Sequence, residues 1–175
     1  MKYFVRMIAV VSVAATVAIP VAMAATASNL PAASRYYPFV GHWKGHGQLS
    51  EPGQKPTPLT LSMSCSKASS GWAVRCEMLA RNGKMKITES DLMGVDPVTG
   101  TGHWYAVTNQ GETHDHVAEW PDPKTMKAHY TWTQDGKKME ENISFEFTGK
   151  KSVAFRSAVS QDGQPAGEFS GKLVR

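Results

Sequence analysis

The chain lacks the short motifs of common enzyme classes and has little excess of charge. It contains no Gly-x-Ser-x-Gly elbow, no phosphate-binding loop, no dinucleotide-binding glycine pattern and no His-Glu-x-x-His helix. Two of its 19 basic residues, Lys2 and Arg6, belong to the N-terminal segment, and the other 17 face 15 acidic residues. Such a balance provides no excess of positive charge that would bind the phosphates of a nucleic acid. These absences argue against an enzyme and against a nucleic-acid-binding protein.

Long apolar runs are also absent, except at the N-terminus. That run follows Lys2 and Arg6 and ends in the small residues 22–24, which is typical of a cleavable signal peptide. We expect residues 1–24 to be removed and the protein to be periplasmic or secreted, in a bacterium. The alternative is a membrane anchor, but Pro20 interrupts a run that is only marginally long enough to span a bilayer. We therefore expect no stable membrane insertion after cleavage.

Cysteine is scarce, with Cys65 and Cys76 as the only two. Neither is near the cleavage site, which excludes a bacterial lipoprotein. Their spacing is far from a Cys-x-x-Cys pair, which argues against redox catalysis. In an exported protein two such residues favour a disulfide. Two buried free thiols are the alternative.

Helical periodicity is missing after Tyr37, whereas short β-branched and aromatic segments alternate with turns such as Asn82-Gly83 and Asp135-Gly136. One helical turn is expected near residues 32–37. About ten strands are expected, at residues 40–49, 57–65, 72–81, 84–93, 102–109, 112–120, 125–133, 138–147, 152–160 and 166–174.

The tight turns between these strands predict an all-β, antiparallel up-and-down barrel, because closure removes the exposed edges of a long sheet. A two-sheet sandwich fits the same pattern and remains the alternative. After the signal peptide, residues 25–37 form a lead-in and residues 38–175 one barrel domain of ordinary size.

Side-chain alternation then assigns each strand's residues to the inside or the outside. If Gln110-Gly111 is a two-residue turn, His116 pairs with Tyr105; if the next turn lies at Asp122-Pro123, His116 also faces His129. The face that carries these histidines is mostly polar, and the opposite face is mostly apolar. The histidines are therefore expected on the outer wall. The register of the last two strands is not assigned, because either parity of the loop at residues 147–152 leaves one phenylalanine misplaced.

Histidines at this spacing could still hold Zn²⁺ or Cu²⁺. The metal-binding candidates are His103, His114, His116 and His129, although an exposed histidine cluster is more often a solvated polar face, and no cofactor is predicted. On the inner face the same register places polar groups beside aromatic ones, as in a small-ligand cavity. The ligand-binding candidates are Trp104, Asp115, Tyr130, Trp132, Met139, Glu141 and Phe145.

The stretch "FVGHWKGHGQL" and the ending "GKLVR" resemble the calycin superfamily of lipocalin-like barrels. In that superfamily a Gly-x-Trp motif closes one barrel end and its Trp packs near a late basic residue; here this implies structural roles for Trp43 and Arg175. Together with the middle run "GVDPVTGTGHWYAVTNQGETHDHVAEW", these segments resemble a family of secreted bacterial lipocalin-like proteins of unknown function. A more distant resemblance, to haem-binding nitrobindin-like barrels, does not extend to haem, because no His follows His129.

The sequence thus predicts an exported protein that holds an apolar or amphipathic small molecule in a barrel cavity. A periplasmic Zn- or Cu-binding protein that uses a surface histidine cluster is the alternative. An enzyme is the third hypothesis, and it depends on Asp115 and Glu141 alone.

Overall fold

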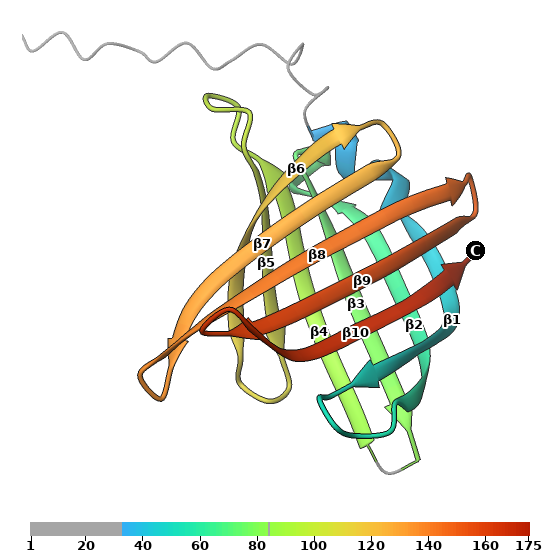
Figure 1. Ribbon diagram of the computed structural model, residues 1–175. Coiled ribbons are helices and arrows are strands. Elements are labelled where there is room, and N and C mark those ends of the chain that lie inside the picture. The colour runs from blue at the N-terminus through green and yellow to red at the C-terminus, as the bar shows by residue number, and fades with distance from the viewer. Residues whose placement is uncertain (1–32, 84) are drawn as a thin grey trace, which may run out of the picture.

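The structure is a computed structural model that describes residues 33–83 and 85–175, and in this part of the chain ten antiparallel strands close into one barrel (Figure 1). Each strand pairs with the next in sequence, and β10 pairs with β1. The predicted up-and-down barrel is confirmed. The strands are β1 (Gly41–Ser50), β2 (Thr57–Ala68), β3 (Ala73–Asn82), β4 (Met85–Val95), β5 (Gly102–Thr108), β6 (Thr113–Asp122), β7 (Thr125–Gln134), β8 (Lys137–Gly149), β9 (Ser152–Gln161) and β10 (Gln164–Val174).

The predicted signal peptide at residues 1–24 lies outside the described residues, as does the lead-in up to residue 32, so cleavage and export stay predictions. Within the described ranges, no helix has the length and apolar character needed to cross a membrane. The two helices there are the short 3₁₀ segments η2 (Ala33–Phe39) and η3 (Ser69–Gly71).

One end of the barrel is closed by η2, which contains the predicted helical turn. Its Tyr36 and Phe39 are fully buried, and the indole nitrogen of Trp43 donates a hydrogen bond of 2.6 Å to the Phe39 carbonyl. The Arg175 guanidinium lies over the Trp43 ring at 4.5 Å and donates to the Val40 carbonyl. The predicted contact between the motif Trp and a late basic residue is therefore present, and it ties the last residue of the chain to the first strand.

The predicted disulfide is confirmed. Cys65 and Cys76 are paired residues of β2 and β3, their Cα atoms are 4.1 Å apart, and they form the bond on the inner face. Pairing of Cys65 with Cys76 in antiparallel strands predicts that Met63 lies opposite Met78, and the two residues are paired. A covalent link across two neighbouring strands also limits the freedom of the unfolded chain.

The first and last strands meet across a line of glycines. A Cβ added to Gly45 would lie only 1.9 Å from the Lys172 carbonyl oxygen, and one added to Gly171 would lie 2.7 Å from the His46 carbonyl oxygen. Side chains at these positions would separate β1 from β10. The glycines of "GHWKGHG" therefore permit the close backbone approach that closes the barrel.

The predicted register is wrong for β6. The loop after β5 has three residues, 109–111, closed by a hydrogen bond from the Gly111 amide to the Thr108 carbonyl, and Gly111 has a φ of +86°. Three-residue hairpin loops commonly need such a residue at this position. Ala106 therefore pairs with His114, in place of the predicted partner Val107. Every side chain of β6 consequently moves to the opposite face.

Candidate functional site

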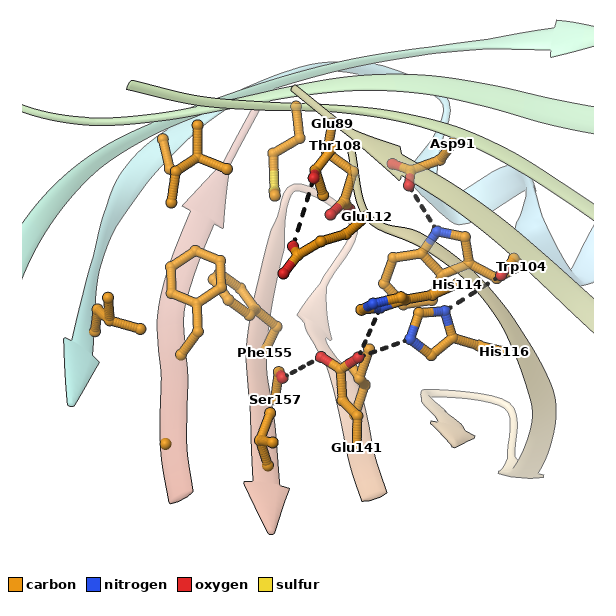
Figure 2. A pocket seen from close by; sticks show the side chains of 18 of the residues that line it. Glu89, Asp91, Trp104, Thr108, Glu112, His114, His116, Glu141, Phe155 and Ser157 are labelled. Carbon is orange, nitrogen blue, oxygen red and sulfur yellow. Dashed lines mark hydrogen bonds and ion pairs between the residues drawn. The ribbon is translucent and has the colours of Figure 1, made fainter. Parts of the chain in front are cut away.

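The barrel encloses a cavity of about 560 Å³, a volume typical of small-molecule sites. It extends from Phe39, next to the closed end, to Glu51 and Gln110 on the loops that follow β1 and β5. Figure 2 shows part of its lining, with aromatic rings and carboxylates on the same wall. The Met, Phe and Trp residues that line it are Phe39, Met63, Met78, Met93, Trp104, Met126, Trp132, Met139, Phe145, Phe155 and Phe169.

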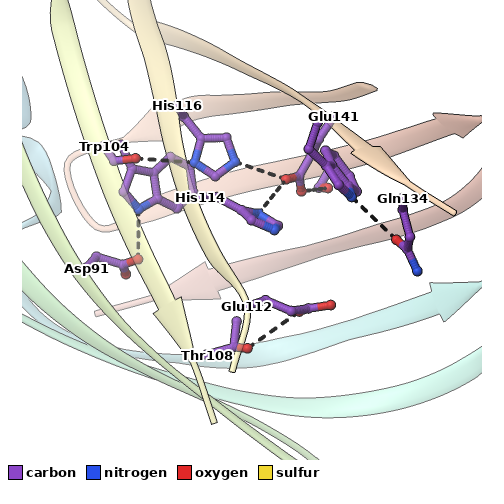
Figure 3. A network of polar contacts seen from close by, with 10 residues as sticks. Asp91, Trp104, Thr108, Glu112, His114, His116, Gln134 and Glu141 are labelled. Atoms are coloured by element: carbon purple, nitrogen blue, oxygen red, sulfur yellow. Dashed lines mark hydrogen bonds and ion pairs between the residues drawn. The ribbon is translucent and has the colours of Figure 1, made fainter. Parts of the chain in front are cut away.

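The polar centre of this cavity is formed by His114, His116 and Glu141. The two histidines stand two residues apart on β6 and so share its inner face, and Glu141 reaches them from β8. One oxygen, Glu141 Oε2, lies 2.9 Å from His116 Nε2 and 3.3 Å from His114 Nδ1. His116 is almost fully buried, whereas His114 is partly exposed on the cavity side (Figure 3).

Further contacts fix these three side chains. Ser157 Oγ donates a hydrogen bond of 2.6 Å to Glu141 Oε1, and His116 Nδ1 lies 3.3 Å from the Trp104 carbonyl oxygen. The His114 ring stacks on Tyr130 and Trp132, with centroids 4.8 Å and 5.3 Å away. Each ring and carboxylate therefore has a defined orientation toward the cavity.

The electrostatics of Glu141 follow from these partners. Burial acts to raise the pKa of Glu141, but hydrogen bonds from His114, His116 and Ser157 outweigh it and hold that pKa well below its usual range. The hydrogen bond to Glu141 in turn raises the pKa of His114. Glu141 is therefore an ionised carboxylate inside the barrel, in a setting where an unpaired charge is costly.

A pair of acidic residues, Glu89 and Asp91 on β4, also lines the cavity. Trp104 Nε1 donates a hydrogen bond of 2.7 Å to Asp91, which is buried. Burial raises the pKa of Asp91 from 3.8 to about 6, against the lowering effect of the hydrogen bonds from Trp104 and Glu89. Burial, and next the charge of Asp91, raise the pKa of Glu89 well above its ordinary value. The pair shares a proton where two free carboxylates would repel each other.

Stability should therefore fall as the pH rises through the titration of Asp91. Below pH 3.8 this carboxyl is protonated in both the folded and the unfolded protein. Between pH 3.8 and about 6 the unfolded chain loses the proton while the folded protein keeps it, so the free energy of unfolding falls. Above about pH 6 the carboxyl is ionised in both, and the loss of stability is complete. A shift of about two pKa units corresponds to roughly 3 kcal/mol.

Asp91→Asn keeps an acceptor for Trp104 without the charge. We expect it to raise the free energy of unfolding by about 2–3 kcal/mol at pH 7.5 and by little at pH 4, measured by urea denaturation.

The matched control is Asp115→Asn, which changes an exposed carboxyl on the outer wall and should alter stability little at either pH. An equal gain for Asp91→Asn at both pH values would contradict the assignment of a charge penalty to this buried carboxyl.

The structure brings together most of the predicted ligand-binding residues. Tyr130 lies on the inner face against His114, whereas Asp115 is wrongly predicted: it is exposed on the outside, 3.4 Å from His103. Whether the inward-facing residues bind a ligand stays a prediction. Those that line the cavity are Trp104, Trp132, Met139, Glu141 and Phe145.

The metal candidates divide into two groups. His103 and His129 are exposed on the outer wall, as expected, but His114 and His116 face inward, which overturns the predicted surface cluster. A carboxylate from another strand accompanies these two histidines, since Glu141 touches both. The physical reason is the one-residue difference in the loop before β6.

Three functional side chains did not emerge from the sequence. Glu89 and Asp91 lie between Ile87 and Met93 at a spacing of two residues, and all four line the cavity. The apolar residues at this spacing could have indicated that both acids face inward. Ser157 had none, because the register of β9 depends on an irregularity between Phe147 and Gly149.

Comparisons with known proteins define the fold. No protein-family model matches the chain, and no curated protein sequence matches it. Among solved structures it is similar to Rv2717c from M. tuberculosis, with a TM-score of 0.62 and 15% identity over 83% of this chain and 97% of that one. It is also similar to the S-type phycobiliprotein lyase CPES from Guillardia theta, with a TM-score of 0.57 and 11% identity over 81% and 90% of the two chains.

A third structure is a protein of unknown function from the DUF3598 family, from Nostoc punctiforme, with a TM-score of 0.54 and 9% identity over 79% of this chain and 48% of that one. These neighbours are calycin-like β-barrels. The chain therefore shares the barrel fold of these structures, and its barrel contains an internal cavity. Identities at this level establish the shape alone.

Proposed function

We propose that this protein is an exported carrier that holds a small apolar or amphipathic molecule inside its barrel. The observation that carries the proposal is the cavity of about 560 Å³, whose wall is mostly apolar and aromatic with one group of oriented polar side chains. Such a composition buries the body of a ligand and fixes its polar end. The barrel neighbours support this use of the fold, and export rests on the predicted signal peptide.

The charges around the cavity favour a ligand whose polar group is neutral or cationic. No Lys or Arg occurs among the described residues that line it. One lining acid, Glu168, is neutralised by Arg156 at 2.7 Å, and Glu141 is paired with the histidines. Glu51 and Glu112 at the mouth have no Lys or Arg beside them among the described residues that line the cavity. An anionic head group would meet repulsion there. The acidic lining residues are Glu51, Glu89, Asp91, Glu112, Glu141 and Glu168.

Two dyes that share a fluorophore test both parts of this proposal. Dansylcadaverine carries an ammonium group and dansyl-6-aminohexanoate a carboxylate on a similar chain. We expect bound dansylcadaverine to show a blue-shifted, stronger emission. We also expect it to bind roughly tenfold more tightly than the carboxylate dye, because the acidic mouth should make the binding free energies of the two dyes differ by about 1.4 kcal/mol. Fluorescence titration at low and high salt measures the difference, which should shrink with salt.

A variant that fills the cavity places the dye inside the barrel. Val159 lines the cavity, whereas its neighbour Ala158 is not among the lining residues. Val159→Trp should weaken dye binding by roughly tenfold or more, and the matched control Ala158→Trp should not, since interior volume is what the ligand needs. Equal affinities in both variants, or tighter binding of the carboxylate dye, would contradict the proposed site.

The prediction that the protein is not an enzyme stays a prediction, since one fold neighbour is named a lyase. Native mass spectrometry of protein purified without a metal-affinity step identifies any cargo that remains bound.

A further inference from the structure

We propose that His114, His116 and Glu141 bind one divalent transition metal ion, with Zn²⁺ as the typical ion, on the inner wall of the barrel. This site lies among the residues of the cavity, but its assignment does not rest on the proposed organic ligand. It replaces the surface cluster expected from the sequence, because two of its ligands face inward and the third is a carboxylate from another strand.

The distances between the three groups suit a small metal ion. One ligand atom from each residue lies within 4.8 Å of the other two, and Glu141 Oε2 is 2.9 Å and 3.3 Å from the two imidazole nitrogens. Nitrogen and oxygen ligands at about 2.0–2.2 Å from a tetrahedral Zn²⁺ are roughly 3.3–3.5 Å apart. Small side-chain adjustments therefore bring all three atoms to bonding distance. Two histidines and one glutamate are also an ordinary zinc ligand set.

The surrounding contacts are those that hold metal ligands in place. His116 directs Nε2 toward the site, while its Nδ1–H donates to the Trp104 carbonyl. Ser157 binds the glutamate oxygen farther from the histidines, which leaves Oε2 directed at both rings. Ligating histidines almost always donate their other N–H to a carbonyl or carboxylate, and ligating carboxylates are themselves hydrogen-bonded.

The hydrogen bonds of His116 give an independent reason to place a metal ion at this site. Both of its ring nitrogens face oxygens that accept, Trp104 O and Glu141 Oε2. The two contacts are satisfied together by a doubly protonated ring, by a protonated Glu141 that donates to Nε2, or by a neutral ring whose Nε2 binds a metal ion. A cation between His116 and Glu141 thus satisfies the buried ring without an imidazolium.

The fourth position of such a site opens into the cavity. His114 is 21% exposed, and its exposed side faces the enclosed volume (Figure 2). Three protein ligands with one open position define a zinc site that accepts a water or a ligand group. The metal would therefore form part of the polar end of the cavity.

Isothermal titration with ZnCl₂ tests the site on full-length purified protein without an affinity tag, stripped with EDTA and free of organic ligand. We expect one Zn²⁺ per chain, proton release on binding, and a Co²⁺ complex with the intense visible absorption of tetrahedral coordination. Removing a ligand should cost more than the roughly 10–100-fold loss that follows removal of an outer contact. His114→Ala and Glu141→Gln should therefore bind Zn²⁺ at least about a hundredfold more weakly.

The matched controls are His103→Ala and His129→Ala, which remove exposed outer histidines and should leave affinity unchanged. Far-UV circular dichroism checks that every variant is folded, and the Co²⁺ spectrum reports on the site itself. The proposal is overturned if the wild-type protein shows no saturable Zn²⁺ binding, if folded His114→Ala and Glu141→Gln bind as the wild type does, or if the outer variants lose the ion. Dye binding in metal-free protein still tests the carrier separately.

Discussion

Gly45→Ala is expected to destabilise the barrel by more than about 3 kcal/mol, beyond the usual cost of one added methyl group. The new Cβ would lie 1.9 Å from the Lys172 carbonyl oxygen and 2.9 Å from its carbon, so it meets backbone that no rotamer change can move. Relief requires β1 and β10 to separate, which breaks the hydrogen-bonded ladder that closes the barrel. Urea denaturation followed by tryptophan fluorescence measures the loss.

Gly94→Ala is the matched control on β4. Its added Cβ would be 3.7 Å from the Trp72 carbonyl oxygen, an ordinary van der Waals contact, and we expect a change within about 0.5 kcal/mol. If both variants lose the same small amount of stability, the close approach of β1 and β10 is not what requires glycine at residue 45. The cavity is formed inside this closed sheet, so ligand binding should fall together with stability in Gly45→Ala.

The sequence was sufficient to predict the barrel, because the two patterns that indicate it can be read within short segments of the chain. Turn residues such as Asp135-Gly136 separate the strands, and apolar residues alternate within them. A two-residue turn at Asp135-Gly136 predicts that Trp132 pairs with Met139, and this pairing is confirmed. A two-residue turn at Asn82-Gly83 predicts that Ala80 pairs with Met85, whereas Ala80 pairs with Ile87, a shift of two residues. A shift of two leaves every side chain on its predicted face.

The site could not be predicted in the same way, because it depends on a shift of one. The three-residue loop before β6 reverses its faces, and the next turn and an irregularity between Glu119 and Asp122 reverse them again. Val117, in place of His116, consequently pairs with His129. The two errors cancel beyond β6, so the inner residues of β7 and β8 were assigned correctly and His114 and His116 were not.

Alternation within β6 was too weak to correct the error from the turn. The inner face presents His114, His116, Ala118 and Trp120, of which two are apolar, while Val117 is 39% exposed outside. A functional strand that directs polar groups into a cavity breaks the rule by which the inside is recognised. Irregularities also explain β9 and β10: shifts after Phe147 and after Pro165 allow both Phe155 and Phe169 to face inward.

Glu141→Ala should cost about 3–5 kcal/mol in metal-free protein, because it removes one partner of a buried charged network. His116 and Ser157, which are 2% and 7% exposed, would lose the carboxylate that both contact. Urea denaturation in EDTA measures the loss. Glu140→Ala, next to it on β8 but paired only with Lys138 at the surface, is the matched control and should cost under about 1 kcal/mol. Similar losses in the two variants would contradict a buried network.

A variant without the whole network shows why the chain keeps it. In His116→Leu/Glu141→Leu/Ser157→Ala, the buried partners are removed together and His114, which is 21% exposed, is the network residue that loses its carboxylate. Apolar replacement of a buried ion pair is often neutral or stabilising. We expect this triple variant to recover most of the stability that Glu141→Ala loses. If it does, hydrogen bonding among these residues contributes little net stability, and their presence at the polar end of a closed barrel reflects what the cavity binds. If it is as unstable as Glu141→Ala, the network is needed for folding, and its residues require no ligand to explain them.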